Sequence, residues 1–304
     1  MKLDFIISKE EDGSTLAAVV RSHAGDIPWS RARGLCERSK VRVGSEVAND
    51  PARRVHRGEK IEIDEHAKTP KLALARLVFE DSQVVVINKP PGVSSVPYEK
   101  RETGTAMDLI RDAWRDDGRK GSDTPLHVVH RIDKDTSGLL LFAKTKPAER
   151  ALQTLFRAHD IERTYLCVVH GKLTDRRIES RLVQDRGDGL RGSSRKLNLG
   201  KRAVTHVKTV EELHDATLCE VKLETGKTHQ IRIHLSENGH PLVGERVYIR
   251  DFVKNEHTPI ESPRLLLHAA TLGFAHPVSG EVLRFSAPLP DDFERELAKL
   301  RRKK

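Results

Sequence analysis

Short apolar runs and segments of alternating apolar and polar residues recur along this chain. They cover residues 41–43, 61–63, 77–79, 83–88, 164–169, 204–210 and 218–223, with two shorter stretches at 265–269 and 283–286. A β-strand turns successive side chains to opposite faces, so alternation indicates a strand with one buried face. A short apolar run bounded by turn residues indicates a strand buried on both faces. The pattern therefore predicts a protein built largely from short strands.

Apolar residues at helical spacing occur in fewer places. The segments that predict helices are residues 30–38, 106–114, 148–156 and 228–237. Ser30 and Thr145 precede or open two of them as candidate N-caps, and Gly239 lies beyond the end of the last. The chain therefore combines many strands with a smaller number of helices.

The composition divides the chain into a small and a large part. We expect a small domain over residues 12–65, a linker over 66–75, a large domain over 76–295 and a basic tail over 296–304, of which residues 301–304 are expected to be disordered. The small domain carries the basic residues Arg53, Arg54, His56 and Arg57. This cluster predicts either an RNA-binding surface or an ordinary solvated charged face.

The charge balance favours a polyanionic partner. The 304 residues include 54 Lys and Arg against 45 Asp and Glu, which gives a formal net charge of +9. Basic side chains that neutralise phosphates release counterions, so a surplus of this size is typical of nucleic-acid binding. Many basic proteins bind no nucleic acid, however, and charge alone leaves both interpretations open.

Cysteines, histidines and hydropathy restrict the class further. The three cysteines are scattered and form no CxxC motif, which favours a reducing compartment over a disulfide scaffold. No histidine pairs with Cys or Glu at the spacing of metal ligands, and we expect no metal site. The amino terminus lacks a cleavage signature, and no apolar run approaches the roughly 20 residues that span a bilayer. We therefore expect a cytoplasmic protein with no membrane partner.

The densest group of reactive side chains lies in residues 130–138, HRIDKDTSG, just before the apolar run 139–143. A polar loop that leads into a buried strand holds a reactive side chain on a rigid support. Asp133 stands between Arg131 and Lys134, whose charges favour an ionised carboxylate that acts as a nucleophile or base. The alternative is that Asp133 only caps a turn and pairs with a neighbour.

A second group lies in residues 225–232, TGKTHQIR. Its glycine allows close approach of the backbone, and the start of the following helix offers unpaired N–H groups to a phosphate. Arg232 is expected to reach a carboxylate elsewhere in the chain. The alternative is a simple strand-to-helix turn with exposed charges. The glycine-rich basic segment 184–203 predicts a mobile RNA-contacting loop or an ordinary surface loop.

These motifs, taken in order, resemble the RluA-type pseudouridine synthases. The matching stretches are Asp81 to KPPG at 89–92, HRID with TSG at 130–138, RTY at 163–165 with Gly171, AVT at 203–205, TGKTHQIR at 225–232, and LHA at 267–269 with HP at 276–277. The likeness spans residues 76–295. Residues 12–65 resemble the small RNA-binding domain first seen in ribosomal protein S-four. One motif arises easily by chance, whereas an ordered set is specific.

The resemblance implies an α+β fold in which a curved, mostly antiparallel sheet is flanked by helices around a basic cleft. It implies that Asp133 is the catalytic aspartate and that Tyr165 packs against the target uracil. Arg131 matches an arginine that fills the gap left by the extruded base. Arg232 matches an arginine that pairs with the catalytic aspartate. The family's isomerisation needs no cofactor or metal.

The same resemblance implies the RNA contacts and the partners. We expect His130, Lys89, Lys227, Thr228, His229 and Gln230 to contact RNA together with Arg131. The substrate would be structured RNA, with large-subunit ribosomal RNA favoured and transfer RNA as the alternative, and the protein would act as a monomer. Two departures from the family pattern lie nearby, since Lys227 stands where arginine is common and Glu245 where aspartate is usual.

Two other functions compete with this one. Residues 135–138, DTSG, match the active-site turn of aspartic proteases, but that chemistry needs two carboxylates that share a proton, and no second such motif occurs. The other competitor is a non-catalytic RNA-binding or ribosome-assembly protein with the same fold. The presence of Asp133, Tyr165 and Arg232 together favours the enzyme.

Overall fold

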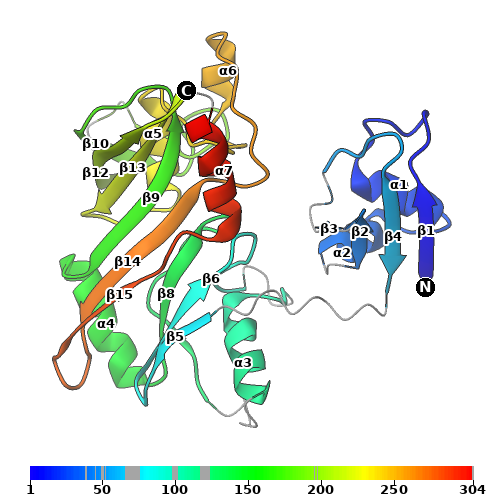
Figure 1. The fold of residues 1–304 in the computed structure, drawn as a ribbon. Coiled ribbons are helices and arrows are strands. Elements are labelled where there is room, and N and C mark those ends of the chain that lie inside the picture. Colours follow the sequence, from blue (N-terminus) through cyan, green and yellow to red (C-terminus); the bar gives the residue numbers. More distant parts are fainter. Residues whose placement is uncertain are drawn as a thin grey trace. The chain divides into compact units, whose positions relative to one another are not determined.

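The structure is a computed structural model of the 304-residue chain. It describes residues 1–37, 40–44, 46–48, 51, 53–65, 76–97, 102–116, 124–194, 196 and 198–302. The chain divides into two compact units, Met1–Ala73 and Leu74–Lys304 (Figure 1). The linker predicted over 66–75 lies outside the described residues.

The N-terminal unit is a four-stranded sheet with two helices. Its elements are β1 (Lys2–Ile6), α1 (Leu16–His23), α2 (Trp29–Glu37), β2 (Val41–Val43), β3 (Glu46–Val47) and β4 (Lys60–Asp64). The strand order is β1-β4-β2-β3, and all pairs are antiparallel. Leu16, Val20, Leu35 and Ile63 are fully or almost fully buried in its core. Because β1 pairs with β4, this unit starts before residue 12, where the sequence placed its boundary.

Two local expectations for this unit change. Ser30 is not an N-cap, because α2 already starts at Trp29 and the carbonyl of Pro28 accepts the first helical hydrogen bonds. The predicted basic cluster is partly occupied by neighbours. Arg53 pairs with Glu59 at 3.4 Å, and Nη1 of Arg54 donates to a backbone carbonyl at 2.7 Å. Fewer of these charges are therefore available to a partner than the sequence indicated.

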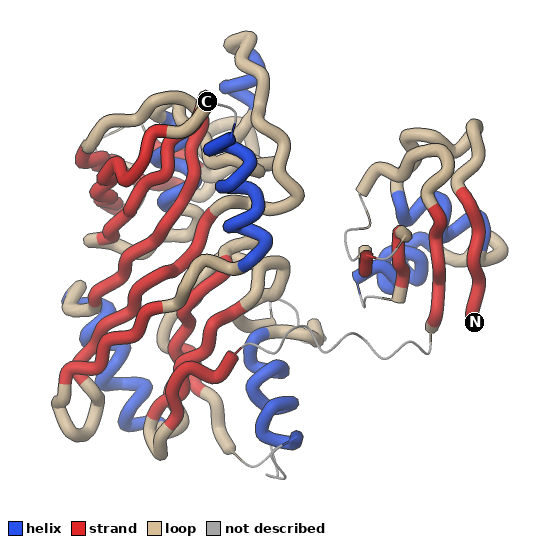
Figure 2. Tube along the Cα trace, in the orientation of Figure 1, coloured by secondary structure: helices blue, strands red, loops and turns tan. Residues whose placement is uncertain are grey.

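The C-terminal unit is built on one large sheet (Figures 1 and 2). Its strands are β5 (Arg76–Glu80), β6 (Val84–Lys89), β7 (His127–Val128), β8 (Ser137–Ala143), β9 (Glu162–His170), β10 (Arg176–Val183), β11 (Gly192–Ser193), β12 (Lys201–Glu212), β13 (Ala216–Leu223), β14 (Leu267–Ala275) and β15 (Val282–Ser286). Its helices are α3 (Ala106–Asp116), α4 (Lys146–Ala158), α5 (Gln230–Glu237), α6 (Arg250–Lys254) and α7 (Asp291–Arg302). The order is β11-β10-β12-β13-β9-β14-β8-β6-β5, with β15 beside β14 and β7 beside β8.

This sheet confirms the expected α+β, mostly antiparallel fold. Among the strand pairs of the described residues, β8 and β14 run parallel and the others antiparallel. Gly138 lies at this parallel junction with φ +112°, and a Cβ there would come within 2.2 Å of the Ala269 carbonyl oxygen. Only glycine allows so close an approach. The junction fixes the start of β8, and with it the loop that carries Asp133.

Helices cover both faces of the sheet. Leu152 and Ala148 of α4 pack in a cluster with residues of β6, β8 and β14, and Thr145 caps the helix as predicted. Ile233 of α5 packs with Leu182 and Ala203 of β10 and β12. Cross-strand pairing places these residues on the face of Tyr165, and α7 packs on the other face.

The disorder predicted for residues 301–304 is wrong for Arg301 and Arg302, and residues 296–300 of the basic tail are helical with them. They belong to α7, in which Phe293, Leu297 and Leu300 are buried against the sheet. Arg301 in the last turn pairs with Glu211. The spacing of these three apolar residues is that of one helix face, but the high charge of the segment obscured it.

Candidate active site

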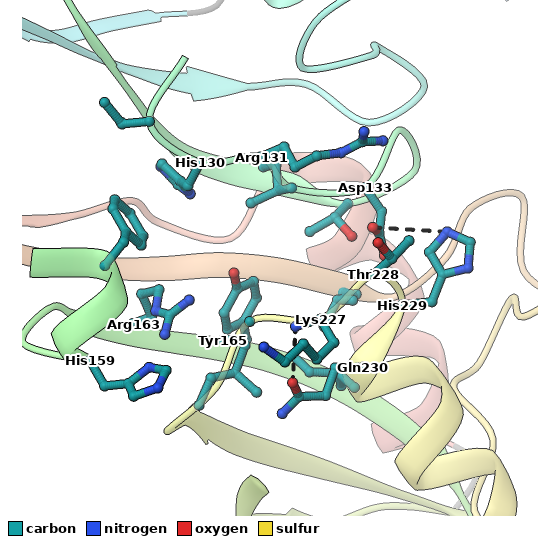
Figure 3. Close-up of a pocket in the computed structure, with 18 of the residues that line it drawn as sticks. His130, Arg131, Asp133, His159, Arg163, Tyr165, Lys227, Thr228, His229 and Gln230 are labelled. Carbon is teal, nitrogen blue, oxygen red and sulfur yellow. Dashed lines mark hydrogen bonds and ion pairs between the residues drawn. The ribbon is translucent and has the colours of Figure 1, made fainter. Parts of the chain in front are cut away.

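A cavity of about 610 Å³ opens on the face of the sheet that carries α5 (Figure 3). Its walls come from residues 129–136, the end of α4, the start of β9 and residues 223–231. Eight of the predicted site residues line it, namely Asp133, Tyr165, Arg131, His130, Lys227, Thr228, His229 and Gln230. Lys89 and Arg232 do not. The fold thus brings together two motifs that lie almost 100 residues apart.

The backbone on both sides of Asp133 is held by two buried side chains. The hydroxyl of Ser95 donates to the carbonyl of Ile132 at 2.6 Å and accepts from its N–H at 3.1 Å. Nζ of Lys89 donates to the carbonyl of Lys134 at 3.0 Å. Thr136 N–H closes a turn by donating to the carbonyl of Asp133 at 3.1 Å. The position of the carboxylate is therefore set by its backbone.

Lys89 was predicted to contact RNA, but the fold turns its amine inward, onto backbone carbonyls. It is fully buried, and its other two Nζ hydrogen bonds go to the carbonyls of Pro90 and Val93. Burial lowers its pKa to about 7, while Asp135 and Asp133 act in the opposite direction. Because three carbonyls take its three protons, Lys89 is a positioning residue for the loop.

The carboxylate of Asp133 faces His229 across the cavity. The gap between Asp133 Oδ1 and His229 Nε2 is 3.9 Å, and no hydrogen bond to the Asp133 side chain occurs among the described residues. His229 adopts a left-handed conformation with φ 56° ahead of α5, and its Nδ1 contacts the Tyr248 hydroxyl at 2.7 Å. Burial lowers the pKa of His229, against the opposing charge of Asp133. The carboxylate oxygens of Asp133 therefore accept no hydrogen bond from the residues that the structure describes.

Tyr165 forms part of the cavity wall from β9. Its side chain is almost completely buried, and burial raises its pKa, an effect that Arg163 opposes and Asp133 reinforces. Figure 3 shows its ring between Arg163 and the segment around Lys227. A neutral phenol with an aromatic face suits a flat, uncharged heterocycle.

Arg232 pairs with Glu245 and not with Asp133, which corrects the second prediction. Its Nε and Nη2 donate to the two carboxylate oxygens at 2.7 and 2.6 Å, and both side chains are buried. Burial disfavours the charge of Arg232, but the hydrogen bonds that it donates to Glu245 outweigh this effect, so the pKa of Arg232 is raised. The charge of Asp133 adds to that rise. Arg232 therefore acts on Asp133 through its field and not through a contact.

His130 and Arg131 behave differently from each other. Leu141 N–H donates to Nε2 of His130 at 3.0 Å, and the imidazole stacks on Phe156 at 4.6 Å. Burial lowers the pKa of His130 to about 3, with Arg163 adding to the effect, so the ring is a neutral acceptor that anchors the loop. Arg131 is exposed at the rim. In the described part of the chain no ion pair holds its guanidinium.

The 225–230 segment is tied down by Gln230. Its Oε1 accepts from Thr225 Oγ1 at 2.8 Å and from Lys227 N–H at 3.0 Å. Its Nε2 donates to the carbonyl of Val204 at 2.9 Å. Gln230 is buried and fully used within the protein, so its predicted contact with RNA is not supported, whereas Thr228 is exposed and accessible.

Several residues of this cavity were not predicted from the sequence. Phe156, Arg157 and His159 come from the end of α4, and Arg163 from β9. The signal for Arg163 was present, because a residue two positions before Tyr165 on a strand shares its face. Nothing in the local sequence indicated that the end of α4 would close the same wall.

A metal site or a membrane-spanning helix would indicate a different class of protein. Among the described residues, no group of three or more His, Cys, Asp or Glu side chains is arranged to hold a metal ion. Over the same residues, no helix has the length and apolar character needed to cross a membrane.

Comparison with known proteins places the cavity in context. Residues 83–237 match the family described as RNA pseudouridylate synthase. The chain is 40% identical over 224 residues to ribosomal large subunit pseudouridine synthase D of Zymomonas mobilis, covering 72% of this chain and 70% of that protein. It is 34% identical to the uncharacterized RNA pseudouridine synthase YlyB of Bacillus subtilis, covering 99% of each. The human RNA pseudouridylate synthase domain containing 4 protein shares the fold, with a TM-score of 0.59 at 24% identity over 76% of this chain and 95% of that one.

Proposed function

Because this chain belongs to the RNA pseudouridylate synthase family, we propose that it converts uridines of large-subunit ribosomal RNA to pseudouridine in the cavity of Asp133. The chain is an RNA pseudouridine synthase, an isomerase that acts on RNA. The identity of the RNA and the roles of the individual side chains are the content of the proposal.

The reaction rearranges one nucleotide without adding or removing atoms. The bond from N1 of uracil to C1′ of ribose breaks, the base turns over, and a bond from C5 to C1′ forms. C5 then loses its proton and N1 gains one. A base stacked in a helix cannot turn over, so it must first be flipped out, at a cost of a few kcal/mol. The protein must therefore hold the base outside the helix and keep it in the cavity.

The cavity has a side chain for each of these tasks. Tyr165 supplies an aromatic face for the flipped uracil, on which a base stacks with about 1–3 kcal/mol of stabilisation. Arg131, exposed at the rim, fills the space that the base leaves in the RNA. Asp133 supplies the ionised oxygen that acts on the nucleotide, as a nucleophile or as a base.

One observation carries the proposal. Asp133 has no hydrogen bond to its carboxylate among the described residues, although Ser95 and Lys89 fix the backbone on both sides of it. Its side chain is 18% exposed, so its oxygens can be reached from the cavity. A carboxylate that is rigidly placed and left open, beside Tyr165 in a cavity that takes a nucleotide, is arranged for chemistry.

The relatives supply the choice of RNA. The Zymomonas mobilis protein is named for the ribosomal large subunit. So is a Neisseria meningitidis protein that is 36% identical to this chain over 278 residues. We extend that target to this chain, with transfer RNA as the alternative. We also propose that the unit Met1–Ala73 is a ribosomal-protein-S-four-like RNA-binding domain, and that the protein acts as a monomer in the cytoplasm. Its three cysteines, all among the described residues, are buried thiols outside any disulfide, which suits a reducing compartment.

Pseudouridine mapping tests this proposal. Total RNA from cells that lack the protein is treated with carbodiimide and read by primer extension, after adding back the wild type or Asp133→Asn. We expect particular pseudouridines of large-subunit ribosomal RNA to disappear and only the wild type to restore them. Loss of sites in transfer RNA alone would replace the target. Unchanged maps, or equal restoration by the variant, would leave only a non-catalytic RNA-binding factor.

A further inference from the structure

Arg163 lies at the wall of the cavity beside Tyr165. The two residues are separated by one position on β9, so their side chains leave the same face of the strand, about 7 Å apart along it. Figure 3 shows Arg163 next to the ring of Tyr165, on the side of His159. Any nucleotide whose base packs on Tyr165 therefore brings its backbone within reach of a guanidinium.

This guanidinium has no anionic partner. Among the described residues no carboxylate forms an ion pair with Arg163, and its Nε is buried without a hydrogen-bond acceptor. A buried donor that is left unsatisfied costs about 1–3 kcal/mol. Most buried charged groups are paired, so an unpaired one in a cavity indicates a missing ligand of opposite charge.

The orientation of Arg163 is fixed before any ligand arrives. Its guanidinium carbon lies 5.4 Å from the ring centre of Phe156, a cation–π contact. Gly226 also lies against the guanidinium, since a Cβ at that position would come within 2.6 Å of Nη1 unless the end of the arginine shifted. An arginine held between an aromatic ring and a glycine pays little entropy when it binds.

The surroundings select an anion over a neutral group. Arg157, His159 and Lys227 line the same cavity, and in the described structure none of them forms an ion pair with a carboxylate. Asp133 is the one acidic residue among the described residues that line the cavity. The wall from α4 to Lys227 is thus basic, whereas the acidic side is confined to Asp133.

We propose that Arg163 binds a backbone phosphate next to the flipped-out uridine, through the two parallel hydrogen bonds that a guanidinium offers a phosphate. This subsite rests on the proposed function, since it assumes an RNA nucleotide in the cavity. Arg163 holds the flipped nucleotide by its phosphate while Tyr165 holds it by its base. With the phosphate fixed, the ribose between them is presented to Asp133 in one orientation.

Replacing Arg163 tests the subsite. The assay is tritium release from [5-³H]uridine-labelled large-subunit ribosomal RNA, and the binding of the same RNA is followed as the salt concentration rises. Arg163→Met keeps the length and apolar contacts of the side chain and removes the charge. We expect kcat/KM to fall about tenfold to hundredfold, as for the loss of a charge-assisted hydrogen bond pair. The slope of log Kd against log salt should drop by about 0.7–0.9, one phosphate contact.

Matched variants separate this role from general charge. Arg163→Lys keeps the charge and loses the paired geometry. It should keep the wild-type salt slope, and its kcat/KM should lie between those of the wild type and Arg163→Met. Arg150→Met removes an exposed charge of α4 outside the cavity and should leave kcat/KM unchanged. An Arg163→Met variant with wild-type kcat/KM and salt slope would overturn the subsite.

A measurement on the unaltered protein covers the case in which the variant does not fold. Once the target uridine is mapped, oligonucleotides carry one uncharged methylphosphonate either 5′ or 3′ of it. We expect one of the two to lower wild-type kcat/KM by about tenfold to hundredfold. Equal activity on both modified and unmodified RNA would overturn the proposal.

The failure of the proposed function has a different signature. If the wild type released no tritium from ribosomal or transfer RNA, the enzymatic assignment of the cavity would be wrong. The salt slope of binding would then still decide whether Arg163 contacts a phosphate. Wild-type release together with an unaffected Arg163→Met would remove the subsite alone and leave the proposed function standing.

Discussion

The turn around Glu245 and the loop around Asp133 hold their carboxylates in opposite ways. Glu245 accepts two hydrogen bonds from Arg232, and its Oε1 also accepts from the N–H groups of Arg246, Val247 and Tyr248 at 2.9–3.3 Å. The Asp133 carboxylate has none of these within the described residues, and the imidazole of His229 lies 3.9 Å from it.

The difference shows how one protein uses the same functional group twice. A carboxylate whose two oxygens both accept hydrogen bonds from a buried arginine stabilises the fold and is not free for chemistry. A carboxylate supported through its backbone keeps its oxygens open, because Ser95 and Lys89 hold the main chain. Arg232 feels the charges of both acids, so the structural pair also sets the electrostatic environment of the open one.

The largest expected effect comes from removing the structural acid. Glu245→Ala leaves Arg232 buried and unpaired, and breaking such a pair costs about 3–5 kcal/mol. Urea unfolding measures the loss. Asp133→Ala is the matched control and should change the free energy of unfolding by less than about 1 kcal/mol. Equal losses for the two variants would erase the distinction between the two sites.

Acid should weaken both regions, since a buried neutral histidine supports each. His268 contacts Ser137 at the end of the Asp133 loop, and His234 of α5 lies two residues after Arg232. Burial lowers the pKa of each to about 4. Between pH 6.5 and 4 the unfolded state binds more protons, so stability falls as the pH falls, by about 2 kcal/mol per histidine at pH 4.5.

The test of this pH dependence is urea unfolding at pH 7.5 and pH 4.5. The His268→Gln variant should lose about 2 kcal/mol less on acidification than the wild type, because glutamine does not titrate. If the variant and the wild type lose the same amount, His268 is not the buried neutral group that the structure indicates.

Ser95→Ala should separate catalysis from stability. The variant removes the hydroxyl that holds both backbone groups of Ile132, at a cost of about 1–2 kcal/mol in unfolding free energy. Because Asp133 loses its fixed position, kcat should fall about tenfold with KM unchanged. Ser94→Ala, whose hydroxyl bonds Glu102 instead, is the control and should keep wild-type kcat. A normal kcat for Ser95→Ala would show that the loop needs no such support.

The smallest effect is expected at Tyr248, which contacts both His229 and Arg232. Tyr248→Phe removes the hydroxyl that contacts Nδ1 of His229 and leaves the ring over Arg232 in place. One hydrogen bond of this kind contributes about 1 kcal/mol, so kcat should fall by no more than about fivefold. A loss as large as that of Ser95→Ala, measured in the same tritium-release assay, would mean that His229 takes part in the chemistry directly.

Local sequence was informative wherever a residue's role depends on its near neighbours. Most strands of the large sheet, though not β7, β10 or β11, and the loop that presents Asp133 could be predicted, because alternation and turn residues act over a few positions. Gly138 is necessary in that loop, but the reason, a clash with β14, involves residue 269 and is invisible locally.

Three wrong or missing predictions at the site, for Arg232, Lys89 and Arg163, share one physical cause. The fold, and not the neighbouring sequence, decides which group lies next to a charged side chain. Arg232 had two acidic candidates, and the one 13 residues away lies in a turn whose amides also need an acceptor. Lys89 read as a surface cation, yet three carbonyls surround it. Arg163 was overlooked since its lack of a partner, and not any contact, is what distinguishes it.

Single-turnover tritium release by purified Asp133→Asn is the most direct test of whether the Asp133 carboxylate acts on the nucleotide. Asparagine has the same shape and removes the ionised oxygen, so folding, checked by thermal melting, should match the wild type. We expect release from [5-³H]uridine-labelled ribosomal RNA to fall at least about a thousandfold, as for other residues that act on the reacting atoms. Release within tenfold of the wild type, from a folded variant, would contradict it.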